Sequence, residues 1–242
     1  MININNLPVR GTALDFVKIA AAILMLIDHI DYMVLERSSG FLYLLGRGAF
    51  PLFAYAAAAS VVRARVENAP KYAWRLLLIA VLIVPIIQWS RDLNAANVIF
   101  TLAVGLGMTP FVMRQSKIGQ HIIYVCGVAS MFLPNLFEFG FIGALLVPLF
   151  YNYIKEGRAQ IWLWMMLGLA NFGGIMPLIE NFEPFQIPII LVIALTTIFL
   201  PVAILALVVR LPNDKKRLMP KYFLHIFYPA HILALAVAAN FI

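Results

Sequence analysis

Long apolar stretches separated by short polar connections make up most of this sequence. Nine stretches can be delimited, and most approach the ~20 residues that a helix needs to cross the hydrocarbon of a bilayer. No connection is long enough to hold a soluble domain, so we expect residues 1–242 to form one integral-membrane domain. The pattern predicts an all-α fold, a polytopic transmembrane helical bundle of about nine spans. The stretches are residues 13–35, 41–62, 72–90, 96–113, 119–135, 139–154, 160–179, 186–209 and 222–241.

The basic residues divide unevenly between the two ends of these stretches. Nearly all of the 18 lysines and arginines lie at the N-terminus or in the even-numbered connections. The odd-numbered connections hold only Arg37 and Arg91, and Arg47 lies within a span. In membrane proteins the cytoplasmic connections carry the excess of Lys and Arg. The N-terminus is therefore predicted to be cytoplasmic, and the C-terminus to lie outside.

The composition supports the same class of protein. Hydrophobic residues make up 63% of the chain and charged residues 12%, whereas a typical soluble domain has ~25% charged residues. The net charge of +7 follows from the bias toward the cytoplasmic side, so no nucleic-acid partner is needed and lipid is the expected surrounding. The single cysteine, Cys126, excludes a disulfide within one chain and fits a packing role better than a nucleophilic one.

Two ionisable residues, Asp28 and His29, lie near the far end of the first stretch. A charged side chain inside a membrane costs about 2.5–3.5 kcal/mol on the mildest scale, and such residues usually mark a site or a pathway. A carboxylate near an imidazole raises its basicity and fixes its tautomer, as a general base requires. Lys18 precedes His29 by 11 residues, about three helical turns, and shares its stripe. The alternative is a polar contact that only fixes helix packing.

The second stretch carries Arg47 between Gly46 and Gly48. Small residues let a ligand or another backbone approach a fixed cation, so Arg47 is a candidate to hold an anion or a developing negative charge. A structural salt bridge to Asp28 or Asp31 explains the same residue equally well, and both roles are compatible.

Further polar residues fall on the predicted outer side and in the last span. Asn97 opens the fourth stretch and Glu138 stands at the entrance of the sixth. Either is a candidate substrate contact, although a helix cap or a solvated boundary residue is the simpler explanation. Tyr228 is three residues from both His225 and His231, and His231 is the candidate second acid or base. This histidine spacing matches no familiar zinc pattern, so no metal is expected.

Taken together and in order, several segments resemble the TraX family of conjugative-pilus proteins. The resemblance covers essentially the whole chain, and its first, second and last segments are the most specific. One position departs from the family pattern, because Glu138-Phe139-Gly140 stands where an Asp-Tyr-Gly-like sequence is expected. The segments are LDFVKIAAAILMLIDHID, GRGAFPLFAY, KYAWRLLLIAVL, NVIFTL, FEFGFIGALLVPLFY and KYFLHIFYPAHILAL.

The resemblance implies an integral inner-membrane acetyltransferase, which in conjugation systems acetylates the N-terminal amine of pilin. It also implies kinship with membrane acyltransferases that carry acyl groups from cytoplasmic acyl-CoA to acceptors outside. Those enzymes pair a basic residue with a histidine along the first span, as Lys18 and His29 are placed here. Acetyl-CoA is then the co-substrate, and a pilin or another envelope component is the expected acceptor.

Under this hypothesis the candidate residues take distinct roles. Lys18 and Arg75 are expected to meet the phosphates of acetyl-CoA. His29 is the expected general base on an acceptor amine or hydroxyl, with Asp28 setting its charge and His231 assisting.

The remaining candidates are expected around the acyl group. Arg47 and Asn97 would stabilise the oxyanion or orient the acyl group, and Tyr228 and Glu138 would contact the substrate. Two other function classes stay open. A transporter or proton-coupled channel would use the intramembrane ionisable residues as a relay, although no internal repeat is evident. A non-catalytic subunit of a pilus or secretion complex would need them only as packing contacts.

Overall fold

The computed structural model describes residues 7–36, 38–90, 97–132, 139–170, 187–211, 216–220 and 222–239. Every regular element in these ranges is a helix, so the predicted all-α fold is confirmed. The elements in chain order are α1 (Gly11–Met33), α2 (Gly40–Gly46), α3 (Ala49–Ala64), η2 (Val66–Asn68), α4 (Ala69–Ser90), α5 (Val98–Arg114), α6 (Lys117–Ala129), η3 (Ser130–Phe132), α7 (Gly140–Glu156), α8 (Ile161–Leu169), α10 (Ile187–Val208) and α11 (Phe223–Ala239).

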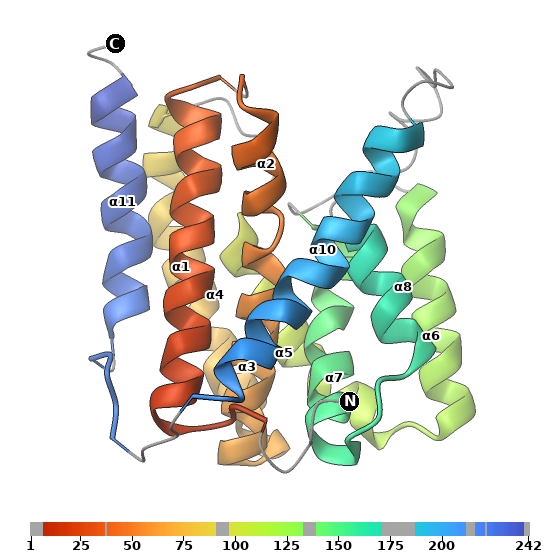
Figure 1. Ribbon diagram of the computed structural model, residues 1–242. Helices are drawn as coiled ribbons and strands as arrows, with labels where there is room; N and C mark the ends of the chain where they lie inside the picture. Colours follow the sequence, from red (N-terminus) through yellow and green to blue (C-terminus); the bar gives the residue numbers. More distant parts are fainter. Residues whose placement is uncertain are drawn as a thin grey trace.

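When α2 and α3 are counted together as one helical unit, successive helical units run in opposite directions and pack as a bundle (Figure 1). Each predicted apolar stretch contains one of these units, in the predicted order. Within the described part of the chain, three helical segments are long and apolar enough to cross a membrane, namely Gly40–Ala64, Val66–Ile86 and Ile187–Val208. They indicate a membrane protein. The first helix, α1, has 23 residues, but charged side chains interrupt its apolar sequence.

The helices α3, α5 and α7 pack together in the interior of the bundle. Most of α7 is buried, including Leu145 and Leu146, and α3 contributes the fully buried alanines Ala54, Ala58 and Ala59. Small side chains let helix backbones approach closely, which is how helices associate in membranes. By contrast, α10 and α11 expose leucine, isoleucine and phenylalanine side chains on their outer faces. Such faces suit contact with lipid.

The second predicted stretch, residues 41–62, contains two helices separated by a short break, and together they form the candidate span Gly40–Ala64. Helix α2 ends at Gly46 and α3 begins at Ala49, so the break falls at Arg47 and Gly48. A Cβ atom added to Gly48 would lie 2.7 Å from Cδ2 of Leu200 in α10, which is too short for a real carbon contact. Glycine therefore lets α10 lie directly against the break.

Two side chains fix the turn that leads from α1 into α2. The Oδ1 atom of Asp31 accepts a hydrogen bond from the backbone N–H of Ser39 at 3.2 Å. The hydroxyl of Ser39 then accepts one from the N–H of Leu42 at 3.3 Å, which caps the start of α2. Asp31 itself is fully buried. The turn thus holds α2 against α1 and brings Arg47 back toward the first helix.

Gly105 of α5 provides a test of the packing against α7. A Cβ atom at this position would collide with the backbone oxygen of Ala144. Gly105→Ala should therefore lower the free energy of unfolding by about 1–3 kcal/mol, as measured by denaturant titration in detergent micelles. Gly107→Ala in the same helix is the matched control, because its Cβ would lie 3.7 Å from Cβ of Ala73, an ordinary contact. Equal losses in both variants would contradict this packing.

Candidate functional site

His29 of α1 and His231 of α11 are in direct contact. The Nδ1 atom of His29 lies 2.7 Å from the Nε2 atom of His231, which is a hydrogen-bonding distance. The two rings are nearly parallel, with centroids 5.0 Å apart and an interplanar angle of 17°. His231 is buried and His29 is half-buried. The fold therefore brings together two predicted site residues that come from the first and last helices.

Two aromatic residues of α11 surround these imidazoles. The ring of Phe227 stacks on His231 with centroids 4.8 Å apart, and the backbone oxygen of Phe227 lies 2.8 Å from Nδ1 of His231. The buried ring of Tyr228 lies edge-on to both histidines, at 6.2 Å from the His29 centroid and 5.4 Å from that of His231. We call these four residues the histidine cluster. It contains three of the predicted site residues.

Asp28 points to a different neighbour, Arg47. The Oδ1 atom of Asp28 and the Nη2 atom of Arg47 form an ion pair that joins α1 to the break between α2 and α3. Both side chains are largely buried, with 12% and 11% of their surfaces exposed. The guanidinium carbon also lies 4.5 Å from the ring centroid of Tyr43, as in a cation–π contact. A Cβ atom on Gly46 would lie only 2.5 Å from Cβ of Asp28, so glycine is needed there.

The two adjacent residues Asp28 and His29 thus contribute to two separate clusters. Consecutive residues of a helix are rotated by about 100°, so Asp28 faces α2 and α3 while His29 faces α11. The salt bridge between Asp28 and Arg47 is the alternative that the sequence left open. The imidazole of His29 instead contacts His231, whose Nδ1 atom lies 2.8 Å from the backbone oxygen of Phe227.

Asn97 serves as a helix cap. Its Oδ1 atom accepts hydrogen bonds from the N–H groups of Ile99 at 3.0 Å and Phe100 at 3.2 Å. Its Nδ2 atom donates to the backbone oxygen of Ala80 in α4 at 3.1 Å. The two ends of the Asn97 amide thus join α4 to α5. Of the two roles that the sequence suggested for Asn97, substrate contact and helix cap, the structure shows the cap. Glu138, the other candidate at the outer side, lies outside the described residues.

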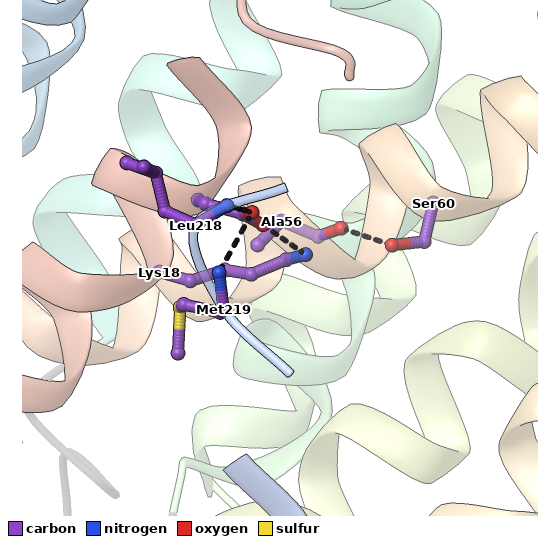
Figure 2. Close-up of polar contacts among 6 residues, drawn as sticks. Lys18, Ala56, Ser60, Leu218 and Met219 are labelled. Atoms are coloured by element: carbon purple, nitrogen blue, oxygen red, sulfur yellow. Dashed lines mark hydrogen bonds and ion pairs between the residues drawn. The ribbon is translucent and has the colours of Figure 1, made fainter. Parts of the chain in front are cut away.

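Lys18 belongs to a polar group near the other end of α1 (Figure 2). Its Nζ atom lies 3.2 Å from Oδ1 of Asp15. The Oδ2 atom of Asp15 accepts hydrogen bonds from the backbone N–H groups of Leu218 at 2.9 Å and Met219 at 3.2 Å. The side chain of Lys18 extends toward Ser60 of α3. These contacts hold the segment that precedes α11 against the first helix.

Additional cations lie near Lys18. Arg63 and Arg217 are close enough for their charges to act on its ammonium group. The region therefore has a surplus of positive charge over the carboxylate of Asp15. Arg75, the other predicted ligand for phosphate, lies exposed on α4, where its charge acts on His225 of α11.

Three contributing residues were not singled out in the sequence. Tyr43 precedes Arg47 by four residues and Asp15 precedes Lys18 by three, spacings at which side chains on one helix face meet. These spacings are a usable signal. Phe227 also precedes its partner His231 by four residues, but it contributes a backbone carbonyl. Because every residue has such a carbonyl, its role carries no signal in the sequence.

The histidine cluster has the groups needed for proton transfer. Imidazoles titrate near neutral pH, and each carries one donor and one acceptor when neutral. The Asp28–Arg47 pair adds a fixed cation whose charge is balanced by its partner. Among the residues that the structure describes, no three His, Cys, Asp or Glu side chains are grouped in a way that suits a metal ion.

Comparisons with known proteins agree with the resemblance noted in the sequence. The family model described as TraX protein matches residues 13–239 of this chain. A relative from Dichelobacter nodosus, described as a probable fimbrial assembly protein FimC of serogroup H1, is 26% identical over 242 residues. That match covers 93% of this chain and 95% of the relative. No solved structure matches the chain.

Removing one partner of the Asp28–Arg47 pair should be costly, because the other charge is left buried and uncompensated. We expect Asp28→Asn to lower the free energy of unfolding by about 3 kcal/mol, measured in detergent micelles. Adding Arg47→Met should recover part of this loss. Glu156→Gln is the control, since it breaks the exposed pair with Lys117 and should cost less than about 0.5 kcal/mol. Simple addition of the Asp28 and Arg47 losses in the double variant would show that the two charges are not coupled.

Proposed function

The chain belongs to the TraX family, and from this premise we propose that it is an acyltransferase of the bacterial inner membrane. It moves an acetyl group from cytoplasmic acetyl-CoA to an acceptor amine or hydroxyl at the outer face. The observation that carries this proposal is the buried contact between His29 and His231, because paired imidazoles suit general acid–base catalysis. The relative described as a fimbrial assembly protein favours the N-terminal amine of a pilin-like subunit as the acceptor.

The proposed topology has nine spans, with the N-terminus cytoplasmic and the C-terminus outside. Two observations support it. Successive helical units alternate in direction (Figure 1), and three helices that share one direction carry a basic residue in their last turn, namely Arg63 of α3, Arg114 of α5 and Lys155 of α7. The positive charge therefore gathers at the end of the bundle where α1 begins, which is the expected cytoplasmic side.

In this orientation the proposed binding regions for acetyl-CoA and for the acceptor lie at different depths along α1. Lys18 and the neighbouring Arg63 and Arg217 lie toward the cytoplasm, where the phosphates of acetyl-CoA arrive. Arg75 on α4 would add a further contact. His29 lies about 16 Å farther along the helix axis, toward the outer face and the acceptor. The pantetheine arm of acetyl-CoA would then have to carry the thioester from one group to the other.

The proposed chemistry uses His29 as the base. Its imidazole takes a proton from the acceptor nitrogen or oxygen as that atom forms a bond to the carbonyl carbon of the thioester. The tetrahedral intermediate then breaks its C–S bond, and the imidazolium returns the proton to the CoA sulfur. Arg47, held in place by Asp28, is the proposed cation for the developing oxyanion. Tyr228 would border the acceptor beside His29, and Asn97 acts indirectly by fixing α4 and α5.

A second candidate function is that of a non-catalytic subunit in fimbrial assembly. The relative's description as a probable fimbrial assembly protein favours it, and the buried polar pairs would then serve only helix packing. The two functions differ in one product. An acyltransferase releases free CoA thiol from acetyl-CoA in proportion to the acetylated acceptor, whereas an assembly subunit releases none.

Loss of the imidazole of His29 should reduce acetyl transfer by at least about 10²-fold, because proton transfer by a positioned base contributes 10²–10⁴-fold. The measurement is the transfer of radiolabelled acetyl groups by purified His29→Ala protein to membrane vesicles that contain envelope acceptors, together with release of thiol. His121→Ala is the matched control, since His121 is exposed on α6 and bonds the backbone oxygen of Lys117. Full activity of a folded His29→Ala protein would exclude His29 as the base.

The topology can be tested with single cysteines in a Cys126→Ala background. Ser38 precedes α2 and Ser116 precedes α6, so the proposed topology places them on opposite sides of the membrane. In intact spheroplasts an impermeant maleimide should label Ser38→Cys, and it should label Ser116→Cys only after permeabilisation. Labelling of both positions from the same side would rule out the nine-span arrangement.

A further inference from the structure

The hydrogen bonds of His231 fix where its proton lies. A backbone carbonyl can only accept a hydrogen bond, and the oxygen of Phe227 lies 2.8 Å from Nδ1 of His231. The Nδ1 atom of His231 therefore carries a hydrogen. When this imidazole is neutral, its Nε2 atom has the lone pair, and Nε2 is the atom that lies 2.7 Å from Nδ1 of His29.

We infer that His231 is a positioning residue that holds His29 in its Nδ1–H tautomer. In the neutral pair the Nδ1–H group of His29 must donate to Nε2 of His231, since only one hydrogen fits between the two nitrogens. The lone pair of His29 then resides on Nε2, on the far side of the ring from His231. The hydrogen bond from His231 to the Phe227 carbonyl and the hydrogen bond from His29 to His231 thus determine which nitrogen of His29 can accept a proton.

The packing around His231 keeps this arrangement in place. The ring of Phe227 stacks on it with an interplanar angle of 16°, and Tyr228 lies edge-on at 78°. Because the carbonyl and the ring both come from the same turn of α11, the orientation of His231 is set locally. Only the docking of α11 against α1 is needed to transmit it to His29.

A second consequence concerns charge. If His29 accepts a proton on Nε2, its imidazolium still donates Nδ1–H to His231, and the positive charge is stabilised by that bond. A second proton would place two cations with ring centroids 5.0 Å apart, which is costly because like charges repel. That Nε2 of His29 serves as the catalytic base rests on the proposed function, whereas the tautomer assignment does not.

The tautomers can be observed directly by nitrogen NMR on the full chain labelled with ¹⁵N-histidine in detergent micelles. At a pH of about 9 the imidazoles are neutral. The resonances of His29 and His231 are assigned by their loss in His29→Gln and His231→Gln. We expect protonated Nδ1 and unprotonated Nε2 in both residues, with a through-bond coupling between Nδ1 of His29 and Nε2 of His231. An Nε2–H tautomer of His29 in the wild-type protein would overturn the inference.

Variants of His231 separate positioning from mere packing. In His231→Gln the side-chain oxygen can still accept from Nδ1–H of His29, so the tautomer should persist, and acetyl transfer should fall by no more than about tenfold. His231→Leu fills the space but offers no acceptor, so the tautomer preference should be lost and transfer should fall by about 10²-fold or more. His225→Gln, on the same helix, should leave the His29 spectrum unchanged. Identical His29 spectra in His231→Gln and His231→Leu would also overturn the inference.

The NMR spectra test the tautomer assignment and the transfer assay tests the proposed function, so either hypothesis can be rejected without the other. An Nδ1–H tautomer in a protein that releases no thiol would leave the positioning of His29 intact and remove the proposed function. Acetyl transfer by a protein whose His29 is in the Nε2–H form would support the proposed function and overturn the positioning of His29 by His231.

Discussion

The structure depends on the requirement that polar groups buried in the first helix have partners, most of which come from other parts of the chain. Asp28 and His29 are adjacent in sequence, but their side chains point about 100° apart. One needs a cation, which Arg47 supplies from the break between α2 and α3. The other needs a hydrogen-bonding group, which His231 supplies from α11. Helix α1 is consequently held between the second and the last helical units of the bundle.

The first and last helices are also joined at a second level. Near the start of α1, the carboxylate of Asp15 accepts hydrogen bonds from the backbone of Leu218 and Met219, just before α11 begins. The contact between His29 and His231 lies about 14 residues farther along α1, or roughly 21 Å at 1.5 Å per residue. Two polar contacts at separate depths thus fix the position of α11 along α1. This matters for the site because a small shift of α11 would separate the imidazoles.

The separation of Asp28 from His29 changes the character of the site. In an Asp–His pair the carboxylate makes the imidazole more basic as well as orienting it. By contrast, a series of hydrogen bonds that ends on the neutral carbonyl of Phe227 orients the imidazole of His29 without adding a negative charge. The Asp28–Arg47 pair is close to neutral as a unit, so its carboxylate does not supply the negative charge that an Asp–His pair would place beside the imidazole. The imidazole contact and the ion pair therefore involve different side chains on neighbouring faces of α1.

The sequence by itself determined the all-α class, the order of the helical units and the positions of the ionisable residues in α1, because a chain in lipid must satisfy its backbone within long apolar helices. It also left open the salt bridge between Asp28 and Arg47, and it favoured a cap at Asn97. The tertiary structure decided which side chains meet. It split the second stretch at Arg47 and Gly48, directed Asp28 away from His29, and recruited the carbonyl of Phe227. The physical reason is that these contacts depend on helix rotation and on the close approach of helices at small residues such as Gly46, and neither is encoded by the spacing of apolar positions.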